Sequence, residues 1–157
     1  MTPLVTLEPI SQLLASRIIA RLQFPGDNWH EQYPFADEII PLQMLLALES
    51  PDPVFTQYQV RDDAGVAVGG IGFFGPPDAE GVVELGYGLV PAGRGRGLAT
   101  AALREAVSIA ATAGALAVIA DALVDNLPSQ RVLTRAGFEE MRRDERLVYF
   151  RRRLADS

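Results

Sequence analysis

The sequence predicts a single α/β domain spanning residues 1–157, built on a mixed, mostly antiparallel sheet of six to seven strands flanked by about four helices. Its length of 157 residues is that of one domain, and such a chain buries enough surface to hold a core without disulfides or metals. A strand–helix–strand pattern over 82–122 predicts a parallel pair joined by a right-handed crossover. Hairpin patterns at 54–74 and 138–152 predict antiparallel neighbours.

The first fifty residues predict one strand and two helices around a polar loop. Residues 4–7 have the composition of a short strand. Apolar residues at helical spacing over 10–22 predict an amphipathic helix, which Pro25 and Gly26 interrupt. A second helix is expected over 37–48.

The remainder of the chain supplies most of the sheet. Alternating residues, punctuated by glycine, proline and aspartate, predict the other strands at 54–61, 66–74, 82–90, 115–122, 138–141 and 147–152. One helix is expected over 98–112, where apolar residues form a single stripe. Another begins near Pro128 and ends at Gly137, because proline suits the first turn of a helix and glycine its end.

The composition excludes several classes of protein and of functional site. The chain contains no cysteine, which excludes a disulfide framework, thiolate metal ligands and a cysteine nucleophile, and its one histidine gives no metal motif. The N-terminus has neither a basic flank nor a long apolar run, and the apolar stretch over 109–122 is short and interrupted by polar residues. We therefore expect a cytoplasmic protein with no membrane segment.

Charge is divided unevenly along the chain. All fourteen basic residues are arginines, and only three lie in residues 1–93, against twelve acidic residues. Residues 94–157 hold eleven arginines against eight acidic residues. This division predicts one face for a cation and another for an anion, although an uneven solvated surface gives the same counts. Nucleic acid is not expected as a ligand at a pI of about 4.8.

A glycine-rich turn over 93–97 precedes the expected helix at 98–112 and carries two arginines. Free N–H groups at a helix N-terminus bind anions, so a phosphate is the expected guest, the alternative being a purely structural turn. A P-loop is excluded because the chain has no lysine. The glycines over 70–75 match a dinucleotide-binding pattern, but two prolines follow where a helix should begin, so these glycines are interpreted as strand-packing positions.

Two motifs resemble one family. The run from Val90 to Thr100 resembles the acyl-coenzyme A loop of the GNAT N-acetyltransferase superfamily, whose Arg-x-x-Gly-x-Ala pattern falls on Arg94, Gly97 and Ala99. The run over 126–138 is similar to the Asn-x-x-Ser-x-Arg segment of the branch that contains ribosomal-protein-alanine N-acetyltransferases. The resemblance covers residues 54–150 well and the first fifty poorly.

The resemblance implies acetyl-CoA as co-substrate, held where the parallel strands at 82–90 and 115–122 splay apart. Backbone groups of Leu89 and Val90 would pair with the pantetheine arm, Asn126 would bind its amide, and Arg131 would reach the phosphates. The other residues expected to hold the diphosphate are in the glycine-rich loop: Arg94, Gly95, Arg96, Gly97, Ala99 and Thr100.

The same resemblance implies transfer of the acetyl group to a primary amine. Glu84 occupies the strand position that holds the general base in several relatives. Leu133 stands where many relatives have a tyrosine acid, so Ser129 is expected to serve the departing sulfur, with helix capping as its equal alternative and Tyr87 as a weaker donor.

The acceptor side is expected from the first helices, the terminal hairpin and a loop containing Trp29, His30, Glu31 and Tyr33. An acidic surface there suits a protein N-terminus or a small cationic amine, and the two aromatic residues form either a cation-binding wall or ordinary packing. A homodimer is the habit of the family. A binding module that senses acyl-CoA without catalysis is the alternative function.

Overall fold

The computed structural model describes residues 3–154. They form one seven-stranded sheet in the order β1-β2-β3-β4-β5-β7-β6. All neighbours are antiparallel except β4 and β5, which run parallel, so the predicted mixed sheet and its one parallel pair are confirmed. The strands are β1 (Val5–Pro9), β2 (Gln57–Asp62), β3 (Ala67–Phe73), β4 (Val82–Leu89), β5 (Ala117–Leu123), β6 (Glu139–Arg143) and β7 (Leu147–Arg153).

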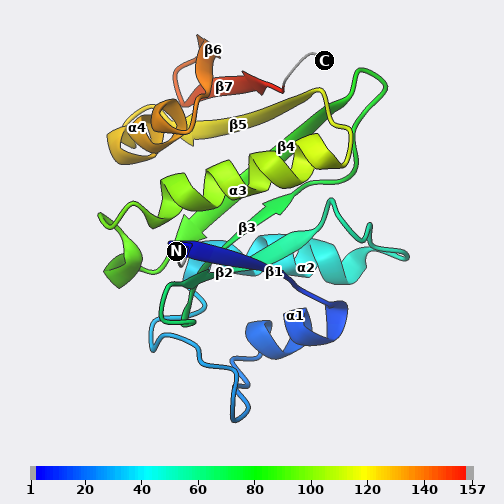
Figure 1. Ribbon diagram of the computed structural model, residues 1–157, viewed down its shortest axis with the longest axis vertical. Helices are drawn as coiled ribbons and strands as arrows, with labels where there is room; N and C mark the ends of the chain where they lie inside the picture. Colours follow the sequence, from blue (N-terminus) through cyan, green and yellow to red (C-terminus); the bar gives the residue numbers. More distant parts are fainter. Residues whose placement is uncertain (1–2, 155–157) are drawn as a thin grey trace.

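Helices cover both faces of the sheet (Figure 1). One face carries α3 (Leu98–Thr112) and α4 (Leu127–Arg135), and the other carries α1 (Gln12–Ile19) and α2 (Ile39–Ala47). Two 3₁₀ turns, η1 (Ala36–Glu38) and η2 (Pro91–Gly93), precede α2 and the glycine-rich loop. No helix within residues 3–154 is long and apolar enough to cross a membrane.

The first helix is shorter than the expected 10–22. It begins after Ser11, whose hydroxyl accepts a 3.0 Å hydrogen bond from the backbone N–H of Leu14. It ends at Ile19 because Arg21 adopts a left-handed conformation with φ of 56°, which a continuing helix does not allow. The second expected helix, 37–48, is divided into η1 and α2, and this division decides the direction of two acidic side chains described below.

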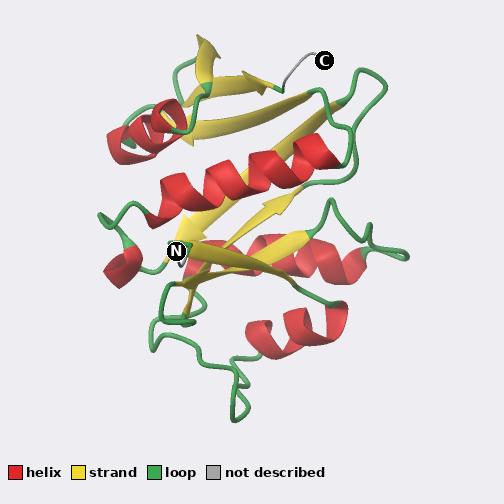
Figure 2. Cartoon of the chain, viewed as in Figure 1, coloured by secondary structure: helices red, strands yellow, loops and turns green. Residues whose placement is uncertain are grey.

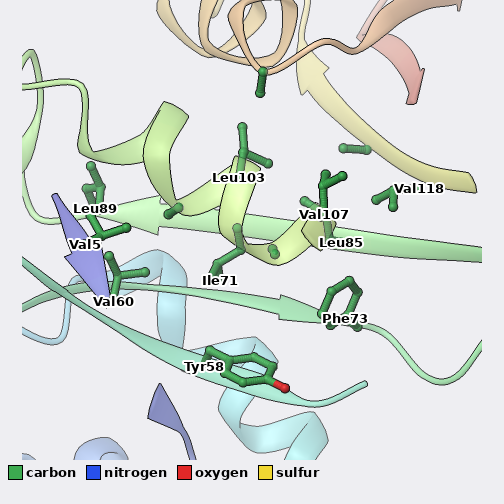
Figure 3. Packing of buried hydrophobic residues seen from close by; sticks show 14 of the residues in the cluster. Val5, Tyr58, Val60, Ile71, Phe73, Leu85, Leu89, Leu103, Val107 and Val118 are labelled. Carbon is green, nitrogen blue, oxygen red and sulfur yellow. The ribbon is translucent and has the colours of Figure 1, made fainter. Parts of the chain in front are cut away.

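The main core lies between α3 and the sheet. Leu103 and Val107 on α3 pack against Ile71 and Leu85 (Figure 3), and all four are buried. Burial of large aliphatic side chains stabilises a fold by roughly 1.5–3 kcal/mol each. This packing fixes the start of α3 against β4, which is where the candidate site lies.

Candidate functional site

The parallel pairing of β4 and β5 stops early. Only Val82, Val83 and Glu84 pair with β5, although β4 continues to Leu89 and β5 to Leu123. The two strands diverge beyond that point (Figure 2). The splay implied by the sequence resemblance is therefore present.

Free backbone groups of β4 face this splay. Hydrogen bonds from Phe74 N to Glu84 O and from Val90 N to Val68 O show that the backbone groups of the even-numbered residues of β4 point toward β3. Because bonding direction alternates along a strand, Tyr87 and Leu89 turn their backbone groups to the other side. The expectation for Val90 is wrong, since its N–H is bonded to Val68 and its carbonyl accepts from Gly93 N, both at 2.9 Å or less.

A cavity of about 410 Å³ lies where the glycine-rich loop meets α3; we call it the loop cavity. Gly95 and Gly97 adopt φ of 75° and 77°, a conformation that favours glycine and leaves amide groups of the loop and the first turn of α3 without intrahelical partners. Its lining includes Ser129 and seven of the ten residues predicted to bind the cofactor: Leu89, Arg94, Gly95, Gly97, Ala99, Thr100 and Asn126.

The arginines that line the loop cavity are not all the ones that the sequence predicted. Arg94 lines the loop cavity and donates a 3.3 Å hydrogen bond to the carbonyl of Leu89. The side chain of Arg96 turns away and pairs with Asp62 at 3.6 Å. Arg131 lines a separate open groove on the outer side of α4, whereas Arg135 lines the loop cavity as well as that groove. Arg135 is thus a basic residue of the site that the sequence analysis missed.

A second cavity, of about 510 Å³, lies on the opposite face of the sheet, and we call it the acidic cavity. Gly70, Gly86 and Gly88 leave its floor without side chains. Its carboxylates come from η1, β4 and β5: Asp37, Glu38, Glu84 and Asp121. Arg146 from the turn before β7 is the one basic residue among its lining residues. Pro41 and Leu42 of α2, together with Arg146 and Leu147 of the terminal hairpin, also line this cavity.

The two cavities meet in the splay. Five residues line both of them: Asp37, Tyr87, Gly88, Asn126 and Ser129. A ligand in the loop cavity and a second ligand in the acidic cavity would therefore approach each other at this junction.

Two hydroxyl groups form a pair at the junction. The Tyr87 hydroxyl lies 2.6 Å from Ser129 Oγ, and burial raises the pKa of Tyr87 while the Ser129 contact opposes that rise. The helix cap is Asn126, whose Oδ1 accepts from Ser129 N at 3.2 Å, so the capping alternative for Ser129 is wrong. Leu133 is fully buried in the core and contributes nothing to either cavity.

Carboxylates of the acidic cavity hold their protons more tightly than usual. Burial raises the pKa of Glu84, and the neighbouring Asp121 raises it further. Burial also raises the pKa of Asp37, which Arg94 partly offsets. Burial raises the pKa of Glu38 to about 8, against a hydrogen bond from the backbone of Phe35 and with a further rise from Asp37. Of these groups, Glu38 is able to exchange a proton near neutral pH.

The loop expected to bind the acceptor lies elsewhere. Trp29 and Tyr33 are core residues with exposures of 8% and 5%, packed edge to face against each other, so the packing alternative holds rather than a cation-binding wall. His30 Nδ1 accepts from Gln32 N, and Glu31 is exposed. None of the four lines either cavity. The loop instead lies at the start of the interior strand β3, where Trp29 forms a bridge with Ala67.

A splayed parallel pair with an amide-lined helix start at its open end is the arrangement that the resemblance to coenzyme A-dependent acyltransferases implied. The family described as "Acetyltransferase (GNAT) domain" matches residues 7–139, so this chain belongs to the GNAT acetyltransferase family.

Individual relatives are distant in sequence and similar in structure. The chain is 27% identical over 117 residues to the "Uncharacterized N-acetyltransferase YjdG" of Bacillus subtilis, covering 74% of this chain and 67% of that protein. The ribosomal-protein-S5-alanine acetyltransferase of Vibrio fischeri superposes with a TM-score of 0.68 at 15% identity, over 96% of this chain and 93% of that one. YncA of Salmonella typhimurium, solved with its cofactor acetyl-CoA, gives a TM-score of 0.64 at 17% identity, over 98% and 96%.

Proposed function

We propose that the protein is an acetyl-CoA-dependent N-acetyltransferase that transfers the acetyl group to a primary amine by direct attack in a ternary complex. The observation that carries this proposal is the meeting of two cavities, one beside a phosphate-binding type of loop and one lined by carboxylates, at a shared junction in the splay. Family membership supports the acetyl group as the one transferred.

The residues of the loop cavity fit acetyl-CoA, which supplies an acetyl thioester on a diphosphate-bearing carrier. Gly95 and Gly97 leave the amides of the loop accessible, since an added methyl group would meet nothing within 4 Å at Gly95 and only Leu4 at Gly97. Arg94 and Arg135 place positive charge in the same cavity. The free backbone groups of Tyr87 and the N–H of Leu89 would pair with the amides of the pantetheine arm, whereas the Leu89 carbonyl already accepts from Arg94.

Glu84 is the proposed proton acceptor. An alkyl amine has a solution pKa near 10.4, so a proton must leave before its nitrogen can attack. Glu84 faces the acidic cavity, and its raised pKa makes its carboxylate a stronger base than an ordinary one. In the proposed step the proton passes to Glu84 directly or through one water, the nitrogen–carbon bond forms and the carbon–sulfur bond breaks.

The Tyr87–Ser129 pair is the proposed partner of the departing sulfur. Its hydroxyl groups lie at the junction, and Tyr87 retains its proton at neutral pH because burial raises its pKa. One of the two hydroxyls would donate to the thiolate while the other donates to its neighbour. Asn126 positions Ser129 by capping α4 and has its own amide at the junction.

Release of free thiol from acetyl-CoA, measured across a panel of primary amines and peptides, tests this function. Activity that depends on an amine is expected, and Glu84→Gln should leave CoA affinity unchanged while lowering kcat by roughly 10²–10⁴-fold and flattening its rise with pH. Glu105→Gln, an exposed carboxylate on α3, is the matched control. Tight binding of acetyl-CoA without thiol release from any amine would favour the non-catalytic sensor, and an unaltered pH profile in Glu84→Gln would exclude Glu84 as the base.

A further inference from the structure

Two side chains from the N-terminal half of the protein contact the glycine-rich loop. The first contact is at η2, where Oε1 of Gln32 accepts a 2.9 Å hydrogen bond from the backbone N–H of Ala92. The second is at Arg96, whose guanidinium group pairs with Asp62 at 3.6 Å. The segment between these contacts includes Gly95 in its left-handed conformation. We call them the two loop contacts, and together they hold the start of the loop at two points.

The carboxylate of Asp62 is itself held in place. Asp62 is the last residue of β2, and its side chain is 9% exposed. Its Oδ1 accepts 3.0 Å hydrogen bonds from the backbone N–H groups of Ala64 and Val66, in the turn between β2 and β3. Its Oδ2 is the atom that pairs with Arg96. Because the carboxylate cannot rotate without breaking both turn bonds, it holds the guanidinium group at a fixed place.

Gln32 lies in an equally well-held segment. Its backbone N–H donates to Nδ1 of His30 at 3.0 Å, and the N–H of His30 donates to the carbonyl of Ala67 at the start of β3. The next residue, Tyr33, is buried in the core. The N-cap of η2 is the apolar Val90, which offers no side-chain acceptor. Gln32 therefore supplies from another part of the chain the acceptor that a capping side chain normally gives.

The direction of Arg96 distinguishes two roles for this residue. Arg94 lines the loop cavity, whereas Arg96 does not, because its side chain extends to Asp62. Arg96 stands between Gly95 and Gly97, two residues whose backbone is free to adopt many conformations. A contact that holds Arg96 therefore restricts the part of the loop that is otherwise least restricted. A loop that is ordered before its ligand arrives binds that ligand more tightly.

We propose that Gln32 and Asp62 are positioning residues that order the glycine-rich loop for the diphosphate of acetyl-CoA, which rests on the function proposed above. Arg96 links Asp62 to the loop and is not itself a phosphate ligand. Without the two loop contacts, binding of the cofactor has to order the loop as well. The cost appears in the affinity for the cofactor and not in the chemical step.

Calorimetric titration with CoA tests the role of Asp62 by the sign of the effect. Removal of an acidic charge close to an anion site strengthens anion binding where charge alone acts. We expect the opposite result for Asp62→Asn, which keeps Oδ1 for the turn and removes the pairing with Arg96. Its affinity for CoA should fall by about two- to fivefold, the range that a partly exposed ion pair supplies. The control Asp63→Asn changes the net charge equally at an exposed neighbouring position and should not weaken binding.

Further variants separate a positioning role from direct contact. Arg96→Gln should weaken CoA binding by the same factor as Asp62→Asn, and the double variant should bind no more weakly than either single variant. Gln32→Met removes the acceptor at similar size and should weaken binding about fivefold, whereas Gln43→Met, at an exposed position on α2, should not. In turnover, Asp62→Asn and Gln32→Met should raise the KM for acetyl-CoA and leave kcat at saturating acetyl-CoA unchanged.

The possible failures are separable. Unchanged or stronger CoA binding in Asp62→Asn, or additive losses in the double variant with Arg96→Gln, overturns the role of Asp62, and unchanged binding in Gln32→Met overturns that of Gln32. Each of these results leaves the proposed function standing. If the wild-type protein does not bind CoA, the proposed function fails, and hydrogen exchange decides the two loop contacts. The amides of Gly93 and Arg94, which are bonded within η2, should then exchange faster in both variants, and unchanged exchange removes the proposal.

Discussion

Glu38→Gln should make the protein more stable at alkaline pH. In the folded protein the pKa of Glu38 is raised from 4.5 to about 8 by burial, so the folded state holds a proton that the unfolded chain releases. Between these two values the free energy of unfolding falls as pH rises, by about 1.4 kcal/mol per pH unit from this group. The loss begins above the unfolded pKa and is complete above the folded one, amounting to about 4–5 kcal/mol at most.

Glutamine keeps the acceptor oxygen for the N–H of Phe35 and removes the charge, so the variant should escape this loss. Urea denaturation at about pH 5 and about pH 9 measures the difference between variant and wild type, which should move in favour of the variant by several kcal/mol between these conditions. Tyr33 and Asp37 also face Glu38, and both are retained in the variant. Parallel pH dependences for the two proteins would refute the reasoning, and Glu105→Gln should track the wild type.

Three further outcomes follow from the site. Gly97→Val should weaken CoA binding by about tenfold or more in calorimetry, since Gly97 has φ of 77° beside the loop amides. As a control, Gly114→Val, at φ of 94° beyond α3, should lower the stability of the protein without changing its affinity for CoA. Tyr87→Phe should lower kcat by about 10–100-fold with little change in the KM for acetyl-CoA, because it removes a donor near the sulfur. Arg135→Ala should weaken CoA binding and its salt dependence, and Arg131→Ala should do neither.

The sequence was sufficient to predict those features of the site that depend on backbone conformation alone. Glycines at the start of a helix favour an anion through local geometry, and the structure has left-handed residues at Gly95 and Gly97 beside a cavity. The strand–helix–strand pattern likewise predicted the parallel pair, because the connection through α3 permits only a parallel return of the chain.

The direction of side chains was predictable only in part. On α4, residues 128, 132 and 135 share the face toward the loop cavity, while residues 127, 130, 131 and 134 face the outer groove. The motif therefore indicated Arg131, whereas Arg135, slightly more than one helical turn further along, is the arginine that lines the loop cavity. The signal that distinguishes Arg135 is its spacing of seven residues from Pro128.

Sequence spacing alone does not indicate that the two carboxylates of η1 line a cavity. Asp37 and Glu38 belong to a segment that resembles the start of an ordinary helix, and acidic residues are common there. Their position in the acidic cavity depends on close approach to Gly88 and Gly70, which are far away in sequence. Trp29 and Tyr33 are a different case. Their sequence allowed either a cation-binding wall or ordinary packing, and the structure buries both in the core.

The side chains of β4 alternate between the hydrophobic core and the acidic cavity, and its backbone borders the splay. Its odd-numbered residues send Leu85 and Leu89 into the core beneath α3, and their backbone groups turn toward the splay. Its even-numbered residues present Gly86, Gly88 and Glu84 to the acidic cavity. A shift of the strand by one residue would exchange these faces, burying Glu84 in the core and filling the floor with leucine side chains. The backbone groups that face the splay, the glycine floor of the acidic cavity and the position of Glu84 are therefore fixed together by one register, in which Gly70 pairs with Gly88.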